Sequence, residues 1–296
     1  MGRNLDEKTI ELVPTGAALG VEIRGIDVTT VDKETFKEIE KAFREHQVLV
    51  FRDQKLTDAQ LLEFARFFGE IDLPRKTRID KDPWIPEHPE IIIVSNLKDE
   101  NGKPLGALGA GEARWHADMT YLEEVPLASV LLAIEIPEKD VPGKDGETGF
   151  CDQYLAYETL PEDLKERIRG RILVHDHVHN STGAVTPNWE EQKSPLETPG
   201  GRHAIAVTHH ATGRKHLFLG RRPYAYIVGL PLDESEELLD RLWAHATQEK
   251  FAWHHEWNAG DLVVWDNWST LHHRNPFDDS KRRIMHRTQI KGVKPQ

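Results

Sequence analysis

Two residues in the segment 114–120, which reads RWHADMT, have the types and the spacing of metal ligands. In an extended chain the side chains at positions i and i+2 point to the same side, so His116 and Asp118 converge while Ala117 points away. Two ligands do not make a site, and the C-terminal segment 265–273 offers His272 and His273 as candidates for a third. Two histidines and one carboxylate, with other positions open, form the ligand set of non-haem Fe(II) oxygenases. We take a site of this kind as the working hypothesis.

A basic cluster follows these histidines and includes Arg282, Arg283 and Arg287. The His116 and Asp118 pair alone is a weak signal, because two such residues in three occur often by chance. The same pair together with a distant histidine, followed by arginine about ten residues later, is much less likely to occur by chance. The alternative for the arginines is a solvated basic strand that binds nothing.

A competing metal site is possible at His175, His177 and His179, which alternate and would share one face of a strand. Three such imidazoles could bind zinc. This segment lacks the carboxylate and the distal arginine of the first set. We therefore favour the first set, with a second metal at these histidines as the alternative.

The elements that must position these residues are mainly short strands. Thr57 and Gln60 predict a capping box at the start of one helix, and Asp233 and Glu236 predict a second box at the start of another. The apolar patterns predict strands at 47–52, 91–94, 127–136, 204–207, 216–219, 251–257, 262–265 and 284–290, and helices at 32–45, 57–68, 154–169 and from 233 onward. We expect a mostly β fold with flanking helices, in which two sheets form a barrel-like sandwich.

The chain has 296 residues, 38% of them hydrophobic, and we expect a single domain over 1–296. The interval 71–113 is rich in proline and glycine and directly precedes the proposed ligand pair, so we interpret it as an active-site lid. The alternative is a surface excursion without function. A second polar, proline-containing interval, 180–202, predicts another mobile loop.

Composition limits the partners. The formal net charge of −12 argues against nucleic acid or acidic lipid, but it allows a small anion in a local basic pocket. The single cysteine, Cys151, excludes an intramolecular disulfide. We find no signal peptide and no apolar run of membrane-spanning length, so we expect a cytoplasmic protein that does not enter the membrane.

Taken together, these motifs resemble the taurine dioxygenase and (2,4-dichlorophenoxy)acetate dioxygenase family of Fe(II)- and 2-oxoglutarate-dependent oxygenases. The resemblance runs from about Ile10 to Pro295. It rests on GVEIRGID (20–27), WHAD (115–118), GET (146–148), GDLVVWDN (260–267) and RRIMHR (282–287). The family has a double-stranded β-helix, or jelly-roll, core and uses O2 as a further co-substrate. The resemblance therefore implies this core, Fe(II), both co-substrates, and a homodimer or homotetramer.

The resemblance also implies a role for each site residue. His116, Asp118 and His272, five residues past Asn267, would bind the iron and form the catalytic centre. Arg283, assisted by the Thr148 hydroxyl, would bind the distal carboxylate of 2-oxoglutarate, because a guanidinium pairs with a carboxylate through two parallel hydrogen bonds. Arg287 would bind the anionic group of a small organic substrate. More residues separate Asp118 from Thr148 than is usual in the family. The extra residues are 139–145, which we interpret as a surface loop.

The substrate class is narrowed by differences within the family. The residues that hold taurine in one branch fall here on Pro74, Thr77 and Glu112, so taurine is not expected. The segment 150–152 and the stretch from 212 to 267 look closer to the aryloxyacetate branch. We expect hydroxylation next to a heteroatom of an aryloxyalkanoate, with ether cleavage to a phenol and an oxo acid. The alternatives are an alkylsulfonate or alkyl sulfate ester dioxygenase, a zinc hydrolase and a non-enzymatic binding protein.

Overall fold

The computed structural model describes residues 10–74, 82–110, 113–138, 145–186, 189–220 and 223–295. Strands dominate this part of the chain and form two large and two small sheets. The larger sheet contains, in spatial order, β1 (Glu11–Pro14), β2 (Val21–Arg24), β3 (Val48–Phe51), β15 (Leu262–Asp266), β7 (Ala128–Glu135), β17 (Ile284–Ile290), β4 (Ile92–Ser95) and β5 (Ala107–Leu108). The second contains β14 (Ala252–His255), β8 (Thr148–Asp152), β16 (Thr270–Arg274) and β6 (Ala113–His116). The small sheets are β10 (Arg202–Ala204), β9 (Ile172–Val174) and β13 (Tyr226–Ile227), and β11 (Ala206–Thr208) with β12 (Lys215–Leu217).

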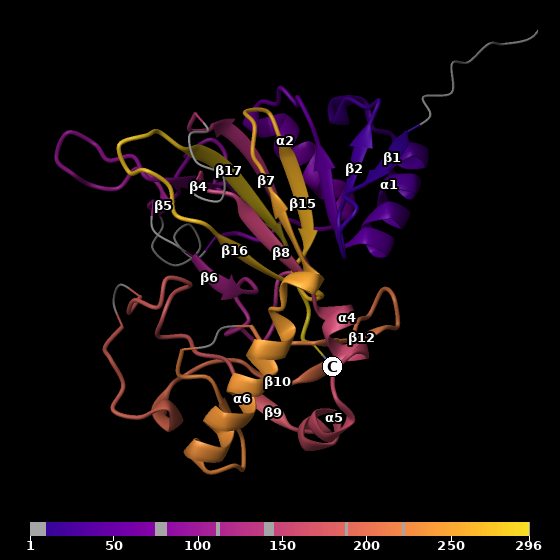
Figure 1. Ribbon diagram of the computed structural model, residues 1–296. Helices are drawn as coiled ribbons and strands as arrows, with labels where there is room; N and C mark the ends of the chain where they lie inside the picture. Colours follow the sequence, from indigo (N-terminus) through magenta and orange to yellow (C-terminus); the bar gives the residue numbers. More distant parts are fainter. Residues whose placement is uncertain are drawn as a thin grey trace, which may run out of the picture.

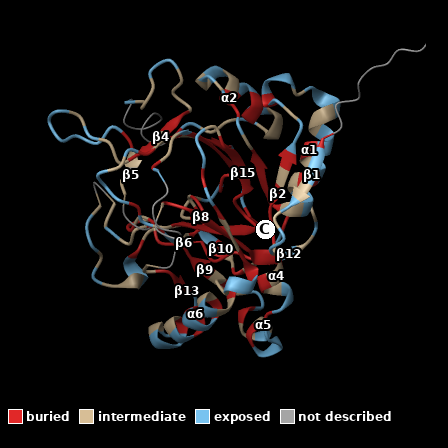
Figure 2. Cartoon of the chain, turned by 45° about the horizontal axis from the view of Figure 1, so that its top comes forward, coloured by how far each residue is buried: buried red, intermediate tan, exposed pale blue. Residues whose placement is uncertain are grey.

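The helices lie outside the two large sheets. In Figure 1, α1 and α2 lie at the upper end beside the larger sheet, whereas α4, α5 and α6 gather at the lower end near β9, β10 and β12. Figure 2 shows that the strands between them are largely buried. The α-helices are α1 (Lys33–His46), α2 (Asp58–Ala65), α4 (Gln153–Glu158), α5 (Glu162–Ile168) and α6 (Leu232–Ala246), and the 3-10 helices are Val28–Thr30, Arg66–Phe68, Pro195–Glu197 and Glu249–Phe251.

The two large sheets face each other across an apolar interior. Phe150 of β8 and Trp265 of β15 meet there, with ring centroids 5.6 Å apart. Buried residues of both sheets join the same cluster, namely Val48, Val50, Ile92, Val94, Leu131, Ala133, Phe150, Val263, Trp265 and Met285. The expectation of a mostly β fold with flanking helices and a double-sheet core is confirmed.

Local signals predicted the helices unevenly. The Thr57 box is confirmed, because the Thr57 side chain and the Gln60 side chain each accept from the other residue's backbone amide. The Asp233 box is wrong, because α6 begins at Leu232 after Pro231 and has no side-chain cap. Asp233 instead lies in the first turn, where a negative charge suits the helix dipole. The helical segment expected at 154–169, with an interruption at Pro161, is two helices, and Pro161 occupies the N-cap position of the second without a side-chain hydrogen bond.

The two intervals expected to be mobile contribute to the sheets. Within 71–113, β4 and β5 extend the edge of the larger sheet, and residues 75–81 and 111–112, with Thr77 and Glu112 among them, lie outside the described residues. Within 180–202, the carbonyl of Ser181 accepts from the amide of Arg114 on β6 at 2.8 Å. The lid and the mobile loop stay predictions, as does the 139–145 surface loop, of which only Asp145 is described.

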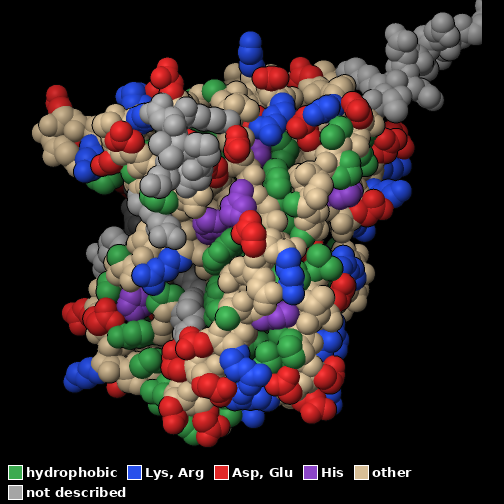
Figure 3. Space-filling view, in the orientation of Figure 1, with side chains coloured by type: hydrophobic (Ala, Val, Ile, Leu, Met, Phe, Trp, Pro, Cys, Tyr) green, Lys and Arg blue, Asp and Glu red, His purple; other side chains and the backbone are tan. Residues whose placement is uncertain are grey.

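The surface bears on the expected partners. In the part of the chain that the structure describes, no helix is long and apolar enough to cross a bilayer. On the face drawn in Figure 3, acidic and basic side chains are interspersed and form no continuous basic stripe.

Candidate active site

The two candidate histidine ligands come from neighbouring strands of the four-stranded sheet. β6 and β16 are antiparallel, and their register puts His116 directly opposite His272. Side chains of directly opposed residues lie on one face of a sheet, and these two rings have centroids 4.2 Å apart. The alternative ligand, His273, lies one residue on and packs instead against Trp115, at 4.2 Å between ring centroids. Strand pairing thus selects His272 over His273.

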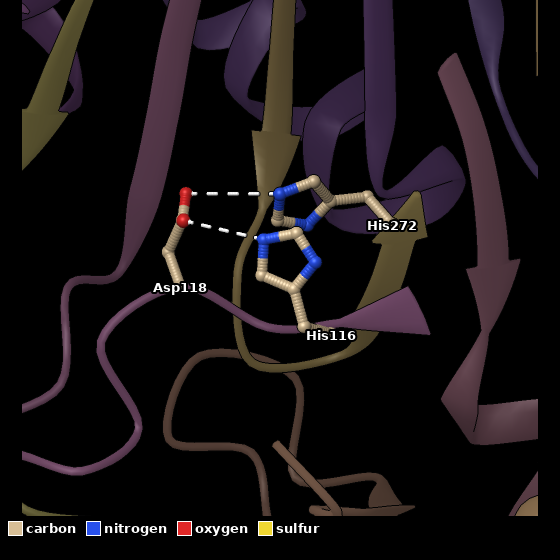
Figure 4. Close-up of side chains that lie close together, drawn as sticks. All are labelled: His116, Asp118 and His272. Atoms are coloured by element: carbon tan, nitrogen blue, oxygen red, sulfur yellow. Dashed lines mark ion pairs between the residues drawn. The ribbon is translucent and has the colours of Figure 1, made fainter. Parts of the chain in front are cut away.

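Asp118 completes the group from just beyond the end of β6. Its carboxylate oxygens lie 3.8 Å from Nε2 of His116 and 3.9 Å from Nε2 of His272, and the three side chains point toward one another (Figure 4). The next residue, Met119, has a φ of +53°, so the chain turns sharply away at once. A non-glycine residue in this strained region is a feature that often accompanies functional sites.

Three side chains distant in sequence hold Asp118 in place. Asn267 accepts from the backbone amide of Asp118 at 2.7 Å and donates to its carbonyl at 2.9 Å. Ser129 and Gln289 donate to one carboxylate oxygen, at 3.1 and 3.2 Å. Ser129 on β7 and Gln289 on β17 thereby orient the carboxylate, whereas Asn267, which directly follows β15, holds the backbone. All three strands belong to the opposite sheet.

The donor atoms suit a divalent cation. One ligand atom from each of His116, Asp118 and His272 lies within 4.8 Å of the others, and within the described ranges these residues form the one such group of His, Cys, Asp or Glu. Nδ1 of His116 lies 2.7 Å from the carbonyl of Arg114. This contact assigns the proton to Nδ1 and leaves Nε2 unprotonated, with the lone pair that a metal ligand needs.

The protonation states agree with metal binding. Burial lowers the pKa of His272 well below its usual range, so its ring is neutral at neutral pH. Burial alone would raise the pKa of Asp118, but the positive charge of Arg287 outweighs it and lowers that pKa. A neutral imidazole and an ionised carboxylate are the states that coordinate a metal. Together the three residues fit Fe(II), for which two histidines and a carboxylate are a typical set.

We predict that Asn267→Ala weakens metal binding, because Asp118 then loses two backbone hydrogen bonds to that side chain. Loss of an outer residue that orients a ligand costs about 10–100-fold in metal affinity. Titration of the apoprotein with Mn(II), followed by calorimetry, measures this loss. Asn258→Ala, at an exposed position, is the matched control, and equal affinities for the two variants would contradict the prediction.

A buried guanidinium, that of Arg283, lies near the start of β8. The Arg283 side chain is buried, with 2% of its surface exposed, and its Nε has no hydrogen-bond partner among the described residues. This Nε lies 3.4 Å from the point that a Cβ on Gly146 would occupy, so Arg283 borders the 146–148 segment. Burial, and then the nearby charge of Arg274, lower the pKa of Arg283 to about 9. A buried guanidinium that is still charged at neutral pH calls for an anion.

Thr148 and Arg287 are the other two residues that the sequence predicts to bind anions. The Thr148 hydroxyl accepts from Nε1 of Trp257 at 2.9 Å, so its own proton is free to be donated. Nη1 of Arg287 lies 3.1 and 3.3 Å from the carboxylate oxygens of Asp118. Arg287 is therefore next to the candidate metal site, and its side chain is 13% exposed. The alternative of a solvated basic strand is excluded for Arg283 and Arg287.

Sequence reasoning missed Asn267, Ser129 and Gln289 as parts of the site. Asn267 and Gln289 are separated from Asp118 by 149 and 171 residues, and no local pattern links them to it. Gln289 could have been found by alternation, because it lies two residues beyond Arg287 on the same face of β17.

The competing histidine cluster does not form a metal site. β9 ends at Val174, so the three residues do not alternate on a strand as proposed. Their rings find different partners: His175 packs against His203, His177 stacks on Tyr121, and His179 bonds to Asp176. A bend in the chain after β9 separates the side chains that a strand would have aligned.

Comparison with known proteins agrees with this geometry. Residues 9–289 match the family described as taurine catabolism dioxygenase TauD, TfdA family. The chain is 31% identical to pentalenolactone F synthase of Streptomyces avermitilis, over 96% of this chain and 94% of that protein. It is also 31% identical to (S)-phenoxypropionate/alpha-ketoglutarate-dioxygenase of Sphingobium herbicidovorans, over 95% of each chain.

A solved structure shows the same architecture with the expected ligands. The chain superposes on AAD-2 in complex with Mn(II) and N-oxalylglycine with a TM-score of 0.76 and 26% identity, covering 97% of this chain and 99% of that one. The likeness confirms the jelly-roll core, and the two ligands agree with a metal and an oxo-acid co-substrate. The chain belongs to the TauD/TfdA family of Fe(II)- and 2-oxoglutarate-dependent dioxygenases.

Proposed function

We propose that His116, Asp118 and His272 hold Fe(II), that Arg283 and Thr148 bind the distal carboxylate of 2-oxoglutarate, and that Arg287 binds the substrate anion. The proposal for the metal is supported by the convergence of three ligand atoms within 4.8 Å. The proposal for 2-oxoglutarate is supported by the buried, incompletely bonded guanidinium of Arg283. Iron bound there would supply the oxidising chemistry that couples decarboxylation of 2-oxoglutarate, with O2, to hydroxylation of a C–H bond.

The protein groups would bind, orient and shield. Nε2 of each histidine faces the Asp118 carboxylate and would coordinate the metal, and Nδ1–H of His116 is held by a backbone carbonyl. Phe150 and Trp265 pack beside His272, at 6.4 and 5.1 Å between ring centroids, and would help to keep water from the reacting centre. Thr148 and Arg283 together would orient the 2-oxo acid by its far end.

We further propose an aryloxyalkanoate as substrate, and the position of Arg287 carries this proposal. Its guanidinium lies 3.1 Å from a carboxylate oxygen of the candidate ligand Asp118. An anion bound to Arg287 therefore lies close to the metal, and so must the carbon that is oxidised. In an aryloxyalkanoate the carboxylate is bonded directly to the carbon that carries the ether oxygen. In an alkyl sulfate ester the reactive carbon is one atom farther from the anionic group. The short distance between Arg287 and the ligand Asp118 therefore suits an alkyl sulfate ester less well than an aryloxyalkanoate.

The relatives support this class without deciding it. One is named for (S)-phenoxypropionate, whereas a relative of equal identity is a pentalenolactone F synthase. An alkylsulfonate, whose reactive carbon is bonded directly to sulfur, is the remaining alternative, because Arg287 can bind a sulfonate as well as a carboxylate. The homodimer or homotetramer and the cytoplasmic location stay predictions.

Purified, Fe(II)-loaded protein tests the substrate class when it is incubated with 2-oxoglutarate and O2. The compounds to compare are aryloxyacetates, 2-aryloxypropionates, alkylsulfonates and alkyl sulfates. We expect an aryloxyalkanoate to give a phenol and succinate in equal amounts, because hydroxylation at the ether carbon gives a hemiacetal or hemiketal that collapses to a phenol and an oxo acid. Stimulation of succinate formation by sulfonates alone would overturn the proposed class and leave the dioxygenase assignment intact.

A further inference from the structure

The backbone turn that follows Asp118 is held by a histidine of a different sheet. The turn is closed by the amide of Leu122, which donates to the carbonyl of Met119 at 2.9 Å. Nε2 of His203 lies 3.0 Å from the carbonyl oxygen of Thr120 and 2.8 Å from that of Leu122. A carbonyl oxygen can only accept a hydrogen bond, so Nε2 carries the proton and donates to both. A single imidazole therefore holds two carbonyls of the turn directly after the candidate ligand.

His203 is itself firmly placed in the small sheet of β9, β10 and β13. It is the central residue of β10, it pairs with Leu173 of β9, and only 1% of its surface is exposed. A Cβ on residue Gly201 would lie 2.6 Å from Nε2 of His203 and 2.7 Å from the carbonyl oxygens of Thr120 and Leu122. Such contacts are too short for a real side chain, so the close approach of the turn to β10 depends on this glycine.

Asp118 is therefore held from two directions. Asn267, which follows β15 of the larger sheet, bonds to the backbone of Asp118 itself. His203 holds the turn from β10, which lies at the lower end of the molecule in Figure 1, away from the larger sheet. Between these contacts Met119 has a φ of +53°, a strained value that persists only where the surrounding structure fixes it. Loss of the His203 contacts would let the turn relax and would change the direction of the Asp118 carboxylate.

We propose that His203 is a positioning residue for the candidate metal centre, because its ring N–H fixes the turn after Asp118 and thereby directs the Asp118 carboxylate. The inference rests on the proposed function, in which Asp118 is a metal ligand. His203 acts through the backbone of Thr120 and Leu122 and would not coordinate the metal. Its loss should therefore lower the affinity for the metal and leave the number of bound ions unchanged.

The test separates the hydrogen bond from the size of the side chain. His203→Leu fills a similar space without a donor, whereas His203→Gln keeps an N–H at the same number of bonds from the backbone. Each apoprotein is titrated with Mn(II) by calorimetry. We expect the leucine variant to bind one equivalent about tenfold more weakly than the wild type, at the lower end of the range for outer residues that orient a ligand. The glutamine variant should recover most of this loss.

His245→Leu is the matched control. Nε2 of His245 also donates to a backbone carbonyl, that of Ala156, at 2.9 Å, but His245 belongs to α6, outside the candidate site. This variant should bind Mn(II) as the wild type does. Thermal unfolding of the metal-free proteins measures the structural effect separately. A merely structural role for His203 would lower the melting temperature of His203→Leu and leave its Mn(II) affinity unchanged.

The inference fails if His203→Leu binds Mn(II) as tightly as the wild type, or if His203→Gln binds it as weakly as the leucine variant. If His203→Leu does not fold, His203→Asn decides in its place. Its shorter amide does not reach both carbonyls, so it should show the same loss of affinity, and wild-type affinity would overturn the inference. Absence of Mn(II) binding by the wild type is a different result, which would overturn the proposed function itself.

Discussion

His116→Ala protein should form no succinate above the level of metal-free protein when Fe(II), 2-oxoglutarate and O2 are supplied. His116 provides one of three ligand atoms that lie within 4.8 Å of one another. Its ring is also oriented by the bond to the Arg114 carbonyl, and an alanine at this position supplies no ligand atom. The variant should bind less than one equivalent of metal, and both the metal content and the succinate yield are measurable.

His210→Ala is the matched control, because His210 is exposed and lies outside the ligand group. This control should keep the metal content and activity of the wild type. Turnover retained by His116→Ala after addition of excess Fe(II) would contradict the proposed ligand set.

Arg287→Gln should lower kcat/KM for the organic substrate by about a hundredfold to a thousandfold. Removing one partner of a buried, hydrogen-bonded charge pair costs about 2–5 kcal/mol, and about 1.4 kcal/mol corresponds to a factor of ten. The guanidinium of Arg287 lies 3.1 Å from Asp118, where a substrate anion would be held beside the metal. The measurement is substrate-dependent succinate formation over a range of substrate concentrations.

The control for this prediction is Arg282→Gln, which removes a guanidinium on the exposed side of the same segment. Calorimetric titration with 2-oxoglutarate should still detect binding to Arg287→Gln, because Arg283 and Thr148 hold that ligand in our account. A kcat/KM close to that of the wild type, with any substrate that stimulates turnover, would exclude Arg287 as the anchor.

The parts of the site predicted best are those in which nearby residues carry the information. Alternation in an extended segment was enough to pair His116 with Asp118, although β6 ends at His116 and Asp118 lies just past it. Alternation failed for His175, His177 and His179, because β9 ends at Val174 before the first of them. Strand boundaries depend on which neighbours pair with the backbone, and local composition does not specify those neighbours.

The choice between His272 and His273 also depends on strand pairing, which local sequence does not specify. Two adjacent residues on a strand point to opposite faces, and only the pairing with β6 reveals that His272 faces His116. Asn267 is likewise beyond local reasoning, since it meets Asp118 through the packing of the two large sheets. The resemblance to a family anticipated His272, but the physical reason is the register of β16 against β6.

Succinate formation with Fe(II) or Zn(II) as the only metal, in the presence and absence of O2, tests the central claim most directly. We predict succinate only when Fe(II), 2-oxoglutarate and O2 are all present, with His116, Asp118 and His272 intact. Zinc should occupy the same ligands and support no turnover, because Zn(II) has no redox chemistry. Absence of succinate from iron-loaded protein, or a reaction that runs equally well with zinc or without O2, would contradict the account and favour a zinc hydrolase or a non-enzymatic binding protein.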